Sequence, residues 1–267
     1  MKTFFENEPV IFSTGGGTPG RLQDTIQNMD RAISLGADVL RSNVAMTADK
    51  KIVLYSDDVF KNKHMAPSGF VSLTLAALRK RHEQFMSENA DGDECEDTDG
   101  IFPELADALS AYPGQRFNLN FPDPSAETVE TAAAIISEQK ADQRTLASSM
   151  HGRLIKKIRS LLPETPTTFS FSAIVGFYAL YRSGFLYFFK NFAADALVIH
   201  EMIGASFIGS QGLIGEAKKR GIRVYMLNVD SEDQARRFHD AGADGYVTGS
   251  VEMVLQALGR SRIDNRG

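Results

Sequence analysis

The chain has 267 residues, of which 43% are hydrophobic and 24% are charged. This composition is typical of a folded globular protein and excludes an intrinsically disordered one. Lys and Arg number 29 against 34 Asp and Glu, which gives a net charge of −5, so no basic field favours nucleic acid as a partner.

Short runs of β-branched and aromatic residues alternate with longer segments of helical periodicity, which is the pattern of βα units around a parallel sheet. The predicted strands are residues 10–14, 39–44, 52–56, 116–121, 145–149, 167–172, 196–201, 223–229 and 245–248. The second and third strands are separated only by residues 45–51, too few for a parallel crossover, so we expect an antiparallel hairpin there. Without the return strand of this hairpin, eight strands remain, and the sequence predicts an α/β fold of the (β/α)₈ TIM barrel type.

Three helix-to-strand joints have nearly the same sequence, which supports a repeated βα architecture. They are Gly36-Ala37-Asp38, Ala193-Ala194-Asp195 and Gly242-Ala243-Asp244. In two of them a glycine is available for a left-handed helix cap. Residues 57–112 interrupt the rhythm, and we predict a small insertion there, with a helix over residues 73–85 and an acidic solvated stretch over residues 87–100. The whole chain, residues 1–267, is expected to form one barrel domain.

The carboxyl ends of the strands are where a barrel enzyme places its catalytic and ligand-binding groups. In this chain the residues at or near these ends include Thr14, Gly15, Gly16, Arg41, Asn43, Ser56 and Asn120. A hard divalent cation prefers several oxygen ligands, carboxylates among them. Only Asp57 and Asp58 offer carboxylates near the first strand ends, so the sequence predicts no metal site.

Motifs between residues 12 and 57 resemble the opening of the glycerophosphodiester phosphodiesterases. That family carries His-Arg-Gly, Pro-Glu-Asn-Thr, a Gly-Ala-Asp joint, Glu-x-Asp, Thr-x-Asp-Gly and His-Asp in this order. The chain keeps Gly16, Asp24-Thr25, Gly36-Ala37-Asp38, Thr47-Ala48-Asp49 and Asp57. Later segments, such as Phe102-Pro103-Glu104-Leu105, also agree. The resemblance covers nearly the whole chain and implies a barrel fold and a phosphodiester substrate.

The resemblance also implies a divalent cation held by carboxylates and two histidines that act as acid and base. At the matching positions this chain has Thr14 and Gly15 for His-Arg, Gln23 for a glutamate, Arg41 and Asn43 for Glu-x-Asp, Ser56 for the second histidine, and Asn120 for a further glutamate. We therefore predict a pseudoenzyme without a cofactor that uses these residues and Gly16 to bind a small phosphorylated or lipid-derived molecule. The alternative is an active phosphoric diester hydrolase of lipid metabolism with a rearranged site.

Two interpretations of Arg41 stay open. Its guanidinium could bind two phosphate oxygens, or it could pair with Asp57 or Asp58 across the hairpin. The glycines after the first strand could likewise approach a phosphate with their amides or form an ordinary turn.

The histidines offer a further route to catalysis. The only acid–base candidates near strand ends are His151, His200 and Glu201, and we retain them as weak catalytic candidates. The remaining histidines, which are His64, His82 and His239, are expected to be exposed to solvent.

The segment from Phe169 to Phe192 is rich in aromatic residues. Such a segment is consistent with a hydrophobic ligand lip, an acyl-chain channel, or a surface for a protein partner or self-association. A buried strand and helix would use several of the same rings.

The cysteine count and the apolar runs predict the compartment. Cys95 is the only cysteine, so no intramolecular disulfide forms and a reducing environment is expected. Acidic residues Glu6 and Glu8 lie where a signal peptide has its apolar region. The apolar run 185–192 is far shorter than the roughly 20 residues of a membrane helix. We expect a cytoplasmic protein with no transmembrane segment.

Overall fold

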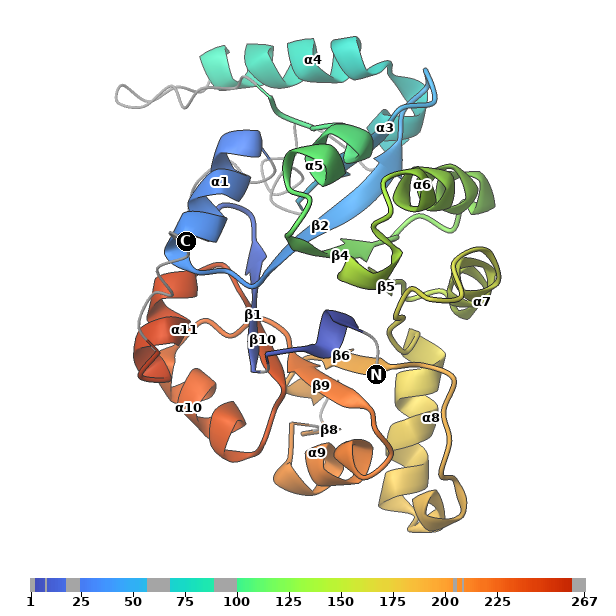
Figure 1. Ribbon diagram of the computed structural model, residues 1–267, viewed down its shortest axis with the longest axis vertical. Coiled ribbons are helices and arrows are strands. Elements are labelled where there is room, and N and C mark those ends of the chain that lie inside the picture. The colour runs from blue at the N-terminus through green and yellow to red at the C-terminus, as the bar shows by residue number, and fades with distance from the viewer. Residues whose placement is uncertain are drawn as a thin grey trace.

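Parallel strands form the centre of the molecule, and helices surround them (Figure 1). The computed structural model describes residues 3–7, 9–17, 25–56, 68–88, 100–203, 206–207 and 209–260. The strands of the main sheet are β1 (Val10–Thr14), β2 (Val39–Met46), β3 (Ile52–Tyr55), β4 (Arg116–Asn120), β5 (Thr145–Ser148), β6 (Ala196–Ile199), β9 (Arg223–Met226) and β10 (Gly245–Thr248). Its parallel order is β5-β4-β2-β1-β10-β9-β6. Two short strands, β7 (Met202–Ile203) and β8 (Ser206–Phe207), pair separately.

The ring between β5 and β6 is closed by two isolated parallel bridges. Thr167 pairs with Ala147 of β5, and Thr168 pairs with Ala196 of β6. The (β/α)₈ barrel is thereby confirmed, but the strand predicted over residues 167–172 is wrong in length. Ser170 takes the N-cap position of the next helix, so the extended conformation ends there.

The helices follow the strands along the chain. They are α1 (Ile26–Leu35), α3 (Ser68–Ser72), α4 (Leu75–Glu88), α5 (Leu105–Ala111), α6 (Ala126–Glu138), α7 (Gly152–Leu161), α8 (Phe171–Arg182), α9 (Gln211–Lys218), α10 (Glu232–Asp240) and α11 (Val251–Ala257), with 3₁₀ turns η1 (Thr3–Phe5), η2 (Asp142–Arg144) and η3 (Phe185–Phe188). Side-chain caps begin several of them; Thr25, for example, accepts from the Asn28 amide at 3.1 Å. Within the described residues, no helix is long and apolar enough to cross a membrane.

The predicted hairpin of β2 and β3 is confirmed, with Asn43 opposite Tyr55 and Met46 opposite Ile52. At its turn, Asp49 accepts hydrogen bonds from the Thr47 hydroxyl at 2.6 Å and from the Leu75 amide at 3.0 Å. These bonds lower the pKa of the Asp49 carboxyl. The Thr-x-Asp motif therefore joins the hairpin to the start of α4.

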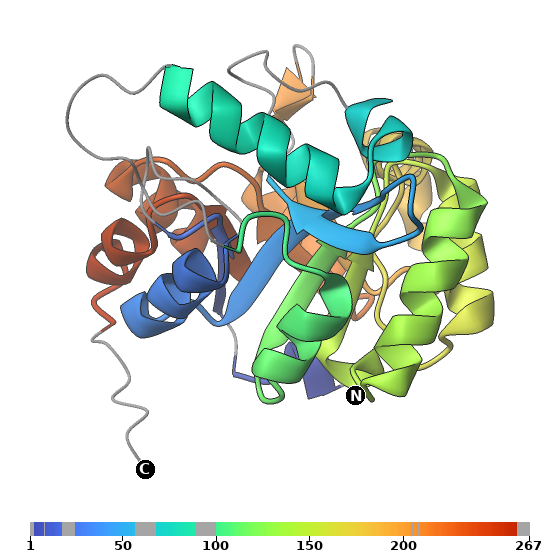
Figure 2. The same cartoon turned by 90° about the horizontal axis from the view of Figure 1, so that it is seen from above.

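The predicted insertion contains α3, α4 and α5, and α4 crosses over β2 and β3 (Figure 2). Helix α4 begins two residues later and ends three residues later than the helix expected over residues 73–85. Residues 57–67 and 89–99, which include Cys95 and most of the acidic stretch, lie outside the described residues. The description of the chain as one domain with an insertion at 57–112 stays a prediction.

The three repeated joints have the same structural role. Each aspartate precedes a strand, and its carboxylate accepts a backbone N–H from a neighbouring strand segment. These bonds join Asp38 to Ile11 at 2.8 Å, Asp195 to Thr167 at 2.8 Å and Asp244 to Val224 at 2.9 Å. The two predicted glycine caps are confirmed, since Gly36 and Gly242 have φ of 99° and 88°.

Apolar side chains fill the barrel near the amino ends of its strands. This inner cluster consists of Val10, Phe12, Val39, Leu146, Ala196, Tyr225 and Val247, with Phe4 and Phe5 of η1 packed against them. Alternate residues of a strand face opposite sides. On β2, Arg41 and Asn43 therefore share the inner face with Val39, whereas Leu40 lies in the outer core between sheet and helices.

Candidate functional site

A polar layer covers the apolar interior at the carboxyl ends of β2, β4 and β5. The Arg41 guanidinium donates a hydrogen bond to the Asn118 side-chain oxygen on the adjacent strand. Asn118 is fully buried, and its Nδ2 donates to the Ser148 hydroxyl at 2.7 Å. Two residues further along both strands, Asn120 Nδ2 donates to the Asn43 side-chain oxygen at 2.7 Å. These described residues of the layer are therefore one cation, Arg41, and neutral hydrogen-bonding groups.

His200 lies close enough to Arg41 for their charges to interact. It directly follows β6 and continues the alternation of Ala196 and Val198, which contact the inner cluster. His200 is exposed at this end of the barrel, yet desolvation by its neighbours and the positive charge of Arg41 both lower its pKa. Both effects favour the neutral ring, in which one nitrogen is able to accept a proton or a hydrogen bond.

The other two catalytic candidates have local partners. Glu201, next to His200, pairs with Arg237 of α10 at 2.6 Å, as expected if consecutive residues of an extended chain face opposite sides. His151 occupies the N-cap position of α7, and its Nε2 lies 3.3 Å from the Pro122 carbonyl oxygen. The structure thus brings His200, but not Glu201, towards Arg41.

The glycine turn after β1 is shaped by its own hydrogen bonds. Gly15 and Gly17 have φ of 62° and 68°, in the region that favours glycine. The Gly17 amide donates to the Gly15 carbonyl at 2.8 Å. A Cβ on Gly16 would lie 2.8 Å from Asn28 Oδ1 of α1. An ordinary turn explains these glycines, and contact with a phosphate stays a prediction.

The remaining predicted ligand positions are placed in part. Thr14 ends β1, and a Cβ on Gly249 would lie 3.8 Å from its hydroxyl. Ser56 follows β3 and is buried. Gln23, Asp57 and Asp58 lie outside the described residues, so the proposed pairing of Arg41 with these aspartates is not tested.

Three histidines were expected to be exposed. His82 is only 1% exposed, and its ring packs edge-on against Phe102 at 5.8 Å, so for His82 the prediction is wrong. The contact comes from a residue distant in sequence, which helical periodicity does not reveal. His239 is exposed on α10, and His64 lies outside the described residues.

The motif resemblance implies a divalent cation held by carboxylates at the carboxyl ends of the strands, which form the mouth of the barrel. The described residues at the matching positions are not carboxylates. Within the described ranges, no three His, Cys, Asp or Glu side chains lie together in a way that could hold a metal ion. At the matching positions the donors are Asn43 and Asn120, and Arg41 adds a positive charge that opposes a cation. The described part of the mouth therefore does not fit a divalent cation.

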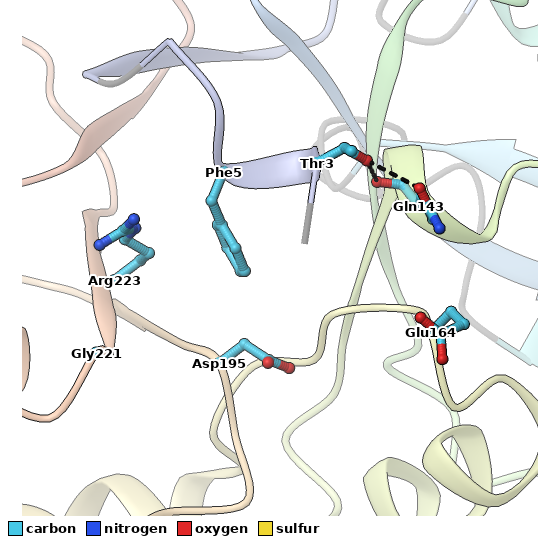
Figure 3. A pocket seen from close by; sticks show the side chains of 7 residues that line it. All are labelled: Thr3, Phe5, Gln143, Glu164, Asp195, Gly221 and Arg223. Atoms are coloured by element: carbon cyan, nitrogen blue, oxygen red, sulfur yellow. Dashed lines mark hydrogen bonds between the residues drawn. The ribbon is translucent and has the colours of Figure 1, made fainter. Parts of the chain in front are cut away.

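A cavity of about 540 Å³ lies at the opposite end of the barrel (Figure 3). Thr3 and Phe5 of η1 line it together with Asp195 and Arg223, which stand at the amino ends of β6 and β9. Since barrel chemistry occurs at the carboxyl ends of the strands, we do not assign this cavity to the candidate site.

The aromatic segment divides into a buried part and an exposed part. Phe169 and Phe177 are buried, and both pack against Phe192 with ring centroids 5.8 and 5.1 Å apart. In contrast, Tyr187 and Phe188 are 77% and 73% exposed. The core interpretation therefore holds for the first group, and the surface interpretation stays open for the second.

The sequence places Asn118 on the fourth strand with Asn120, but it does not predict that Asn118 and Ser148 bond to the site. It also does not predict Arg237 as the partner of Glu201. The alternation on the fourth strand was the available signal, because Asn118 precedes Asn120 by two residues and must share its face. No local pattern indicates which residue of a neighbouring strand lies beside Arg41.

Comparisons with known proteins agree with this architecture. Rat lysophospholipase D GDPD1 (Rattus norvegicus) is 19% identical over 253 residues, covering 87% of this chain and 81% of that protein. A glycerophosphoryl diester phosphodiesterase domain from Mycobacterium tuberculosis superposes with a TM-score of 0.76 at 16% identity, covering 94% of this chain and 99% of that domain.

A third similar protein is a phosphodiesterase from Oleispira antarctica, solved in complex with the product sn-glycerol-3-phosphate. It has a TM-score of 0.72 at 16% identity, with 96% of this chain and 99% of that chain covered. The sequence model of the glycerophosphoryl diester phosphodiesterase family matches residues 16–253. Because this match spans most of the chain, the protein belongs to the glycerophosphoryl diester phosphodiesterase family.

Proposed function

We propose that this protein binds a small phosphorylated or lipid-derived molecule at the mouth of its barrel and acts as a pseudoenzyme without metal-dependent catalysis. The observation that carries the proposal is the position of Arg41. Its guanidinium faces inward from β2 and donates to Asn118, and by the motif resemblance its position matches that of a metal-binding carboxylate in the family. A guanidinium has five N–H donors in a planar fork that matches phosphate oxygens.

The neighbours of Arg41 suit an anion better than a cation. Asn43 and Asn120 bond to each other, and amides of this kind offer neutral polar partners. His200 has a lowered pKa, so its neutral ring can serve as a hydrogen-bond partner but adds little positive charge. The related phosphodiesterase from Oleispira antarctica binds sn-glycerol-3-phosphate, which supports a phosphate monoester as the class of ligand.

Arg41→Gln tests this proposal by calorimetry with sn-glycerol 3-phosphate in the presence of EDTA. A hydrogen bond to a charged group contributes about 1.5–3 kcal/mol, so the variant should weaken binding about 10-fold to 150-fold. Arg236→Gln is a matched control, because Arg236 is an exposed cation of α10 that pairs with Glu232 at the surface. Equal affinities of wild type and Arg41→Gln would contradict the proposal.

A second candidate function is an active phosphodiester hydrolase with a rearranged site. The lowered pKa of His200 and its position near Arg41 favour it, because a neutral imidazole can accept a proton from water. The water oxygen would form the new bond to phosphorus while Arg41 stabilises the charge, and the bond to the leaving alcohol would break. His200 would then return the proton to that alcohol.

Hydrolysis of a glycerophosphodiester in EDTA distinguishes the two functions. Turnover that persists in EDTA and falls about 100-fold or more in His200→Gln would support the hydrolase, because general acid–base groups contribute roughly 10²–10⁴-fold. Binding without turnover would support the pseudoenzyme. His239→Gln is the matched control, because His239 is an exposed histidine of α10 and its replacement should leave either property unchanged.

A further inference from the structure

Four aromatic side chains form an exposed cluster that we name the aromatic knuckle. It consists of Phe185, Tyr187, Phe188 and Phe189, which are 59%, 77%, 73% and 46% exposed. Ring centroids of Tyr187 and Phe188 lie 5.6 Å apart, and those of Phe185 and Phe188 lie 6.3 Å apart. The rings of Phe185, Tyr187 and Phe188 therefore pack against one another at the surface rather than in the core of the barrel.

The backbone of the knuckle is held firmly. Leu186 is 3% exposed and packs into the outer core. Arg220, which follows α9, donates to the Leu186 carbonyl at 2.7 Å and to the Phe189 carbonyl at 2.8 Å. Glu216 orients Arg220 through an ion pair of 2.6 Å. The fold thus fixes the turn while directing its rings to solvent, an arrangement that marks an interaction surface.

The charges around the knuckle indicate what it contacts. Arg182 and Lys190 flank it, and residues 171–194 contain no Asp or Glu. Neither cation forms an ion pair with a carboxylate in the ranges that the structure describes. Glu216, the carboxylate that orients the turn, is neutralised by Lys219 and Arg220. The surface is therefore both aromatic and positively charged.

A cavity at the opposite end of α8, where this helix begins, carries further positive charge. It has a volume of about 570 Å³ between α7 and α8, and its wall includes Phe192, Ala193 and Ala194, just after Lys190. Its charged lining residues are Arg153, Lys156 and Arg159, and none of its lining residues is acidic. In Figure 1, α8 runs away from the strands towards the edge of the molecule, so its far end is accessible to an extended surface.

We infer that the aromatic knuckle docks on the surface of an anionic lipid bilayer. Aromatic rings favour the boundary between headgroups and acyl chains, and Arg182 and Lys190 would contact acidic headgroups. A second copy of this chain fits less well, because a two-fold contact would place the same cations against one another. The inference does not depend on which ligand occupies the barrel mouth.

The chain has no tryptophan, so Phe188→Trp introduces a single indole reporter. With vesicles of phosphatidylcholine and phosphatidylserine, its emission should shift to the blue in a saturable manner. Each cation near an acidic surface strengthens binding about fivefold. Arg182→Gln with Lys190→Gln in this background should therefore weaken binding about 25-fold.

Vesicle co-sedimentation supplies a second measurement without the reporter. Phe185→Ser, Tyr187→Ser and Phe188→Ser together should abolish sedimentation, because each buried ring contributes about tenfold to binding. Val71→Ser, a change of an exposed apolar residue on α3, is the matched control and should sediment like wild type. Circular dichroism verifies that the triple variant folds, as expected for exposed positions.

Three results would overturn the inference. The first is the absence of a fluorescence shift with acidic vesicles while wild type also stays in the supernatant. The second is equal binding to vesicles of phosphatidylcholine alone, which would remove the role of the cations. The third is a shift that grows with protein concentration in the absence of lipid, which would identify self-association instead.

Discussion

Asp244 offers the sharpest test of the repeated helix-to-strand joint. Its side chain is 5% exposed, accepts the Val224 amide at 2.9 Å and pairs with Lys218 at 2.9 Å. A hydrogen bond to a charged group contributes about 1.5–3 kcal/mol, and the buried amide left without its acceptor adds a desolvation cost. We expect Asp244→Ala to lower the free energy of unfolding by about 3 kcal/mol. For a chain of this size, that corresponds to a fall in Tm of about 6–12 °C.

Urea denaturation followed by circular dichroism measures this loss, and two variants bracket it. Asp244→Asn keeps an acceptor oxygen without the charge, so it should lose about half as much stability. Asp240→Ala changes an exposed aspartate at the end of α10 and should stay within about 0.5 kcal/mol of wild type. An Asp244→Ala protein as stable as Asp240→Ala would refute the structural role assigned to the joint.

Other predictions concern the mouth, the barrel packing and metal ions. Besides desolvation, the charge of Arg41 lowers the pKa of His200, so Arg41→Gln should raise that pKa in an NMR titration. An unchanged pKa would contradict an electrostatic interaction between the two side chains. A histidine in the unfolded chain has a higher pKa than His200 has in the fold. Protonation of the unfolded chain should therefore reduce the free energy of unfolding as the pH falls below 6.5, and this loss should be smaller in Arg41→Gln. Gly245→Ala would place a Cβ 2.5 Å from the Val10 carbonyl oxygen and should cost about 1–3 kcal/mol in urea denaturation, whereas a neutral effect would contradict the close strand packing. EDTA should leave the midpoint of unfolding unchanged, and a lowered midpoint would indicate a structural metal.

Much of the fold could be predicted because its signals are local. The short linker between the second and third strands requires a hairpin. Gly36 and Gly242 indicate helix ends because glycine readily adopts the left-handed cap conformation that both residues have. The run 167–172 was ambiguous, since apolar and hydroxyl residues suit both a strand and the start of a helix. Its outcome depends on Ser170 as the N-cap of α8, a choice that tertiary packing makes.

The candidate site was predictable only in part. The inward position of Arg41 and Asn43 follows from strand alternation, and the same rule would have separated Glu201 from His200. The partner of Arg41 could not be predicted, because Asn118 lies 77 residues away and is brought beside it by the register of β2 and β4. The prediction that His82 is exposed was wrong for the same reason, because its burial depends on a contact with Phe102, which is distant in the sequence.

Turnover of a glycerophosphodiester, measured side by side with EDTA and with added Mg²⁺ or Ca²⁺, tests the central claim most directly. We expect sn-glycerol 3-phosphate to bind equally under both conditions through Arg41, and we expect neither condition to support metal-dependent hydrolysis. Robust hydrolysis that appears only with the divalent cation, and that EDTA abolishes, would contradict the pseudoenzyme proposal. It would place the metal ligands of this family among residues such as Asp57 and Asp58, which lie outside the described ranges.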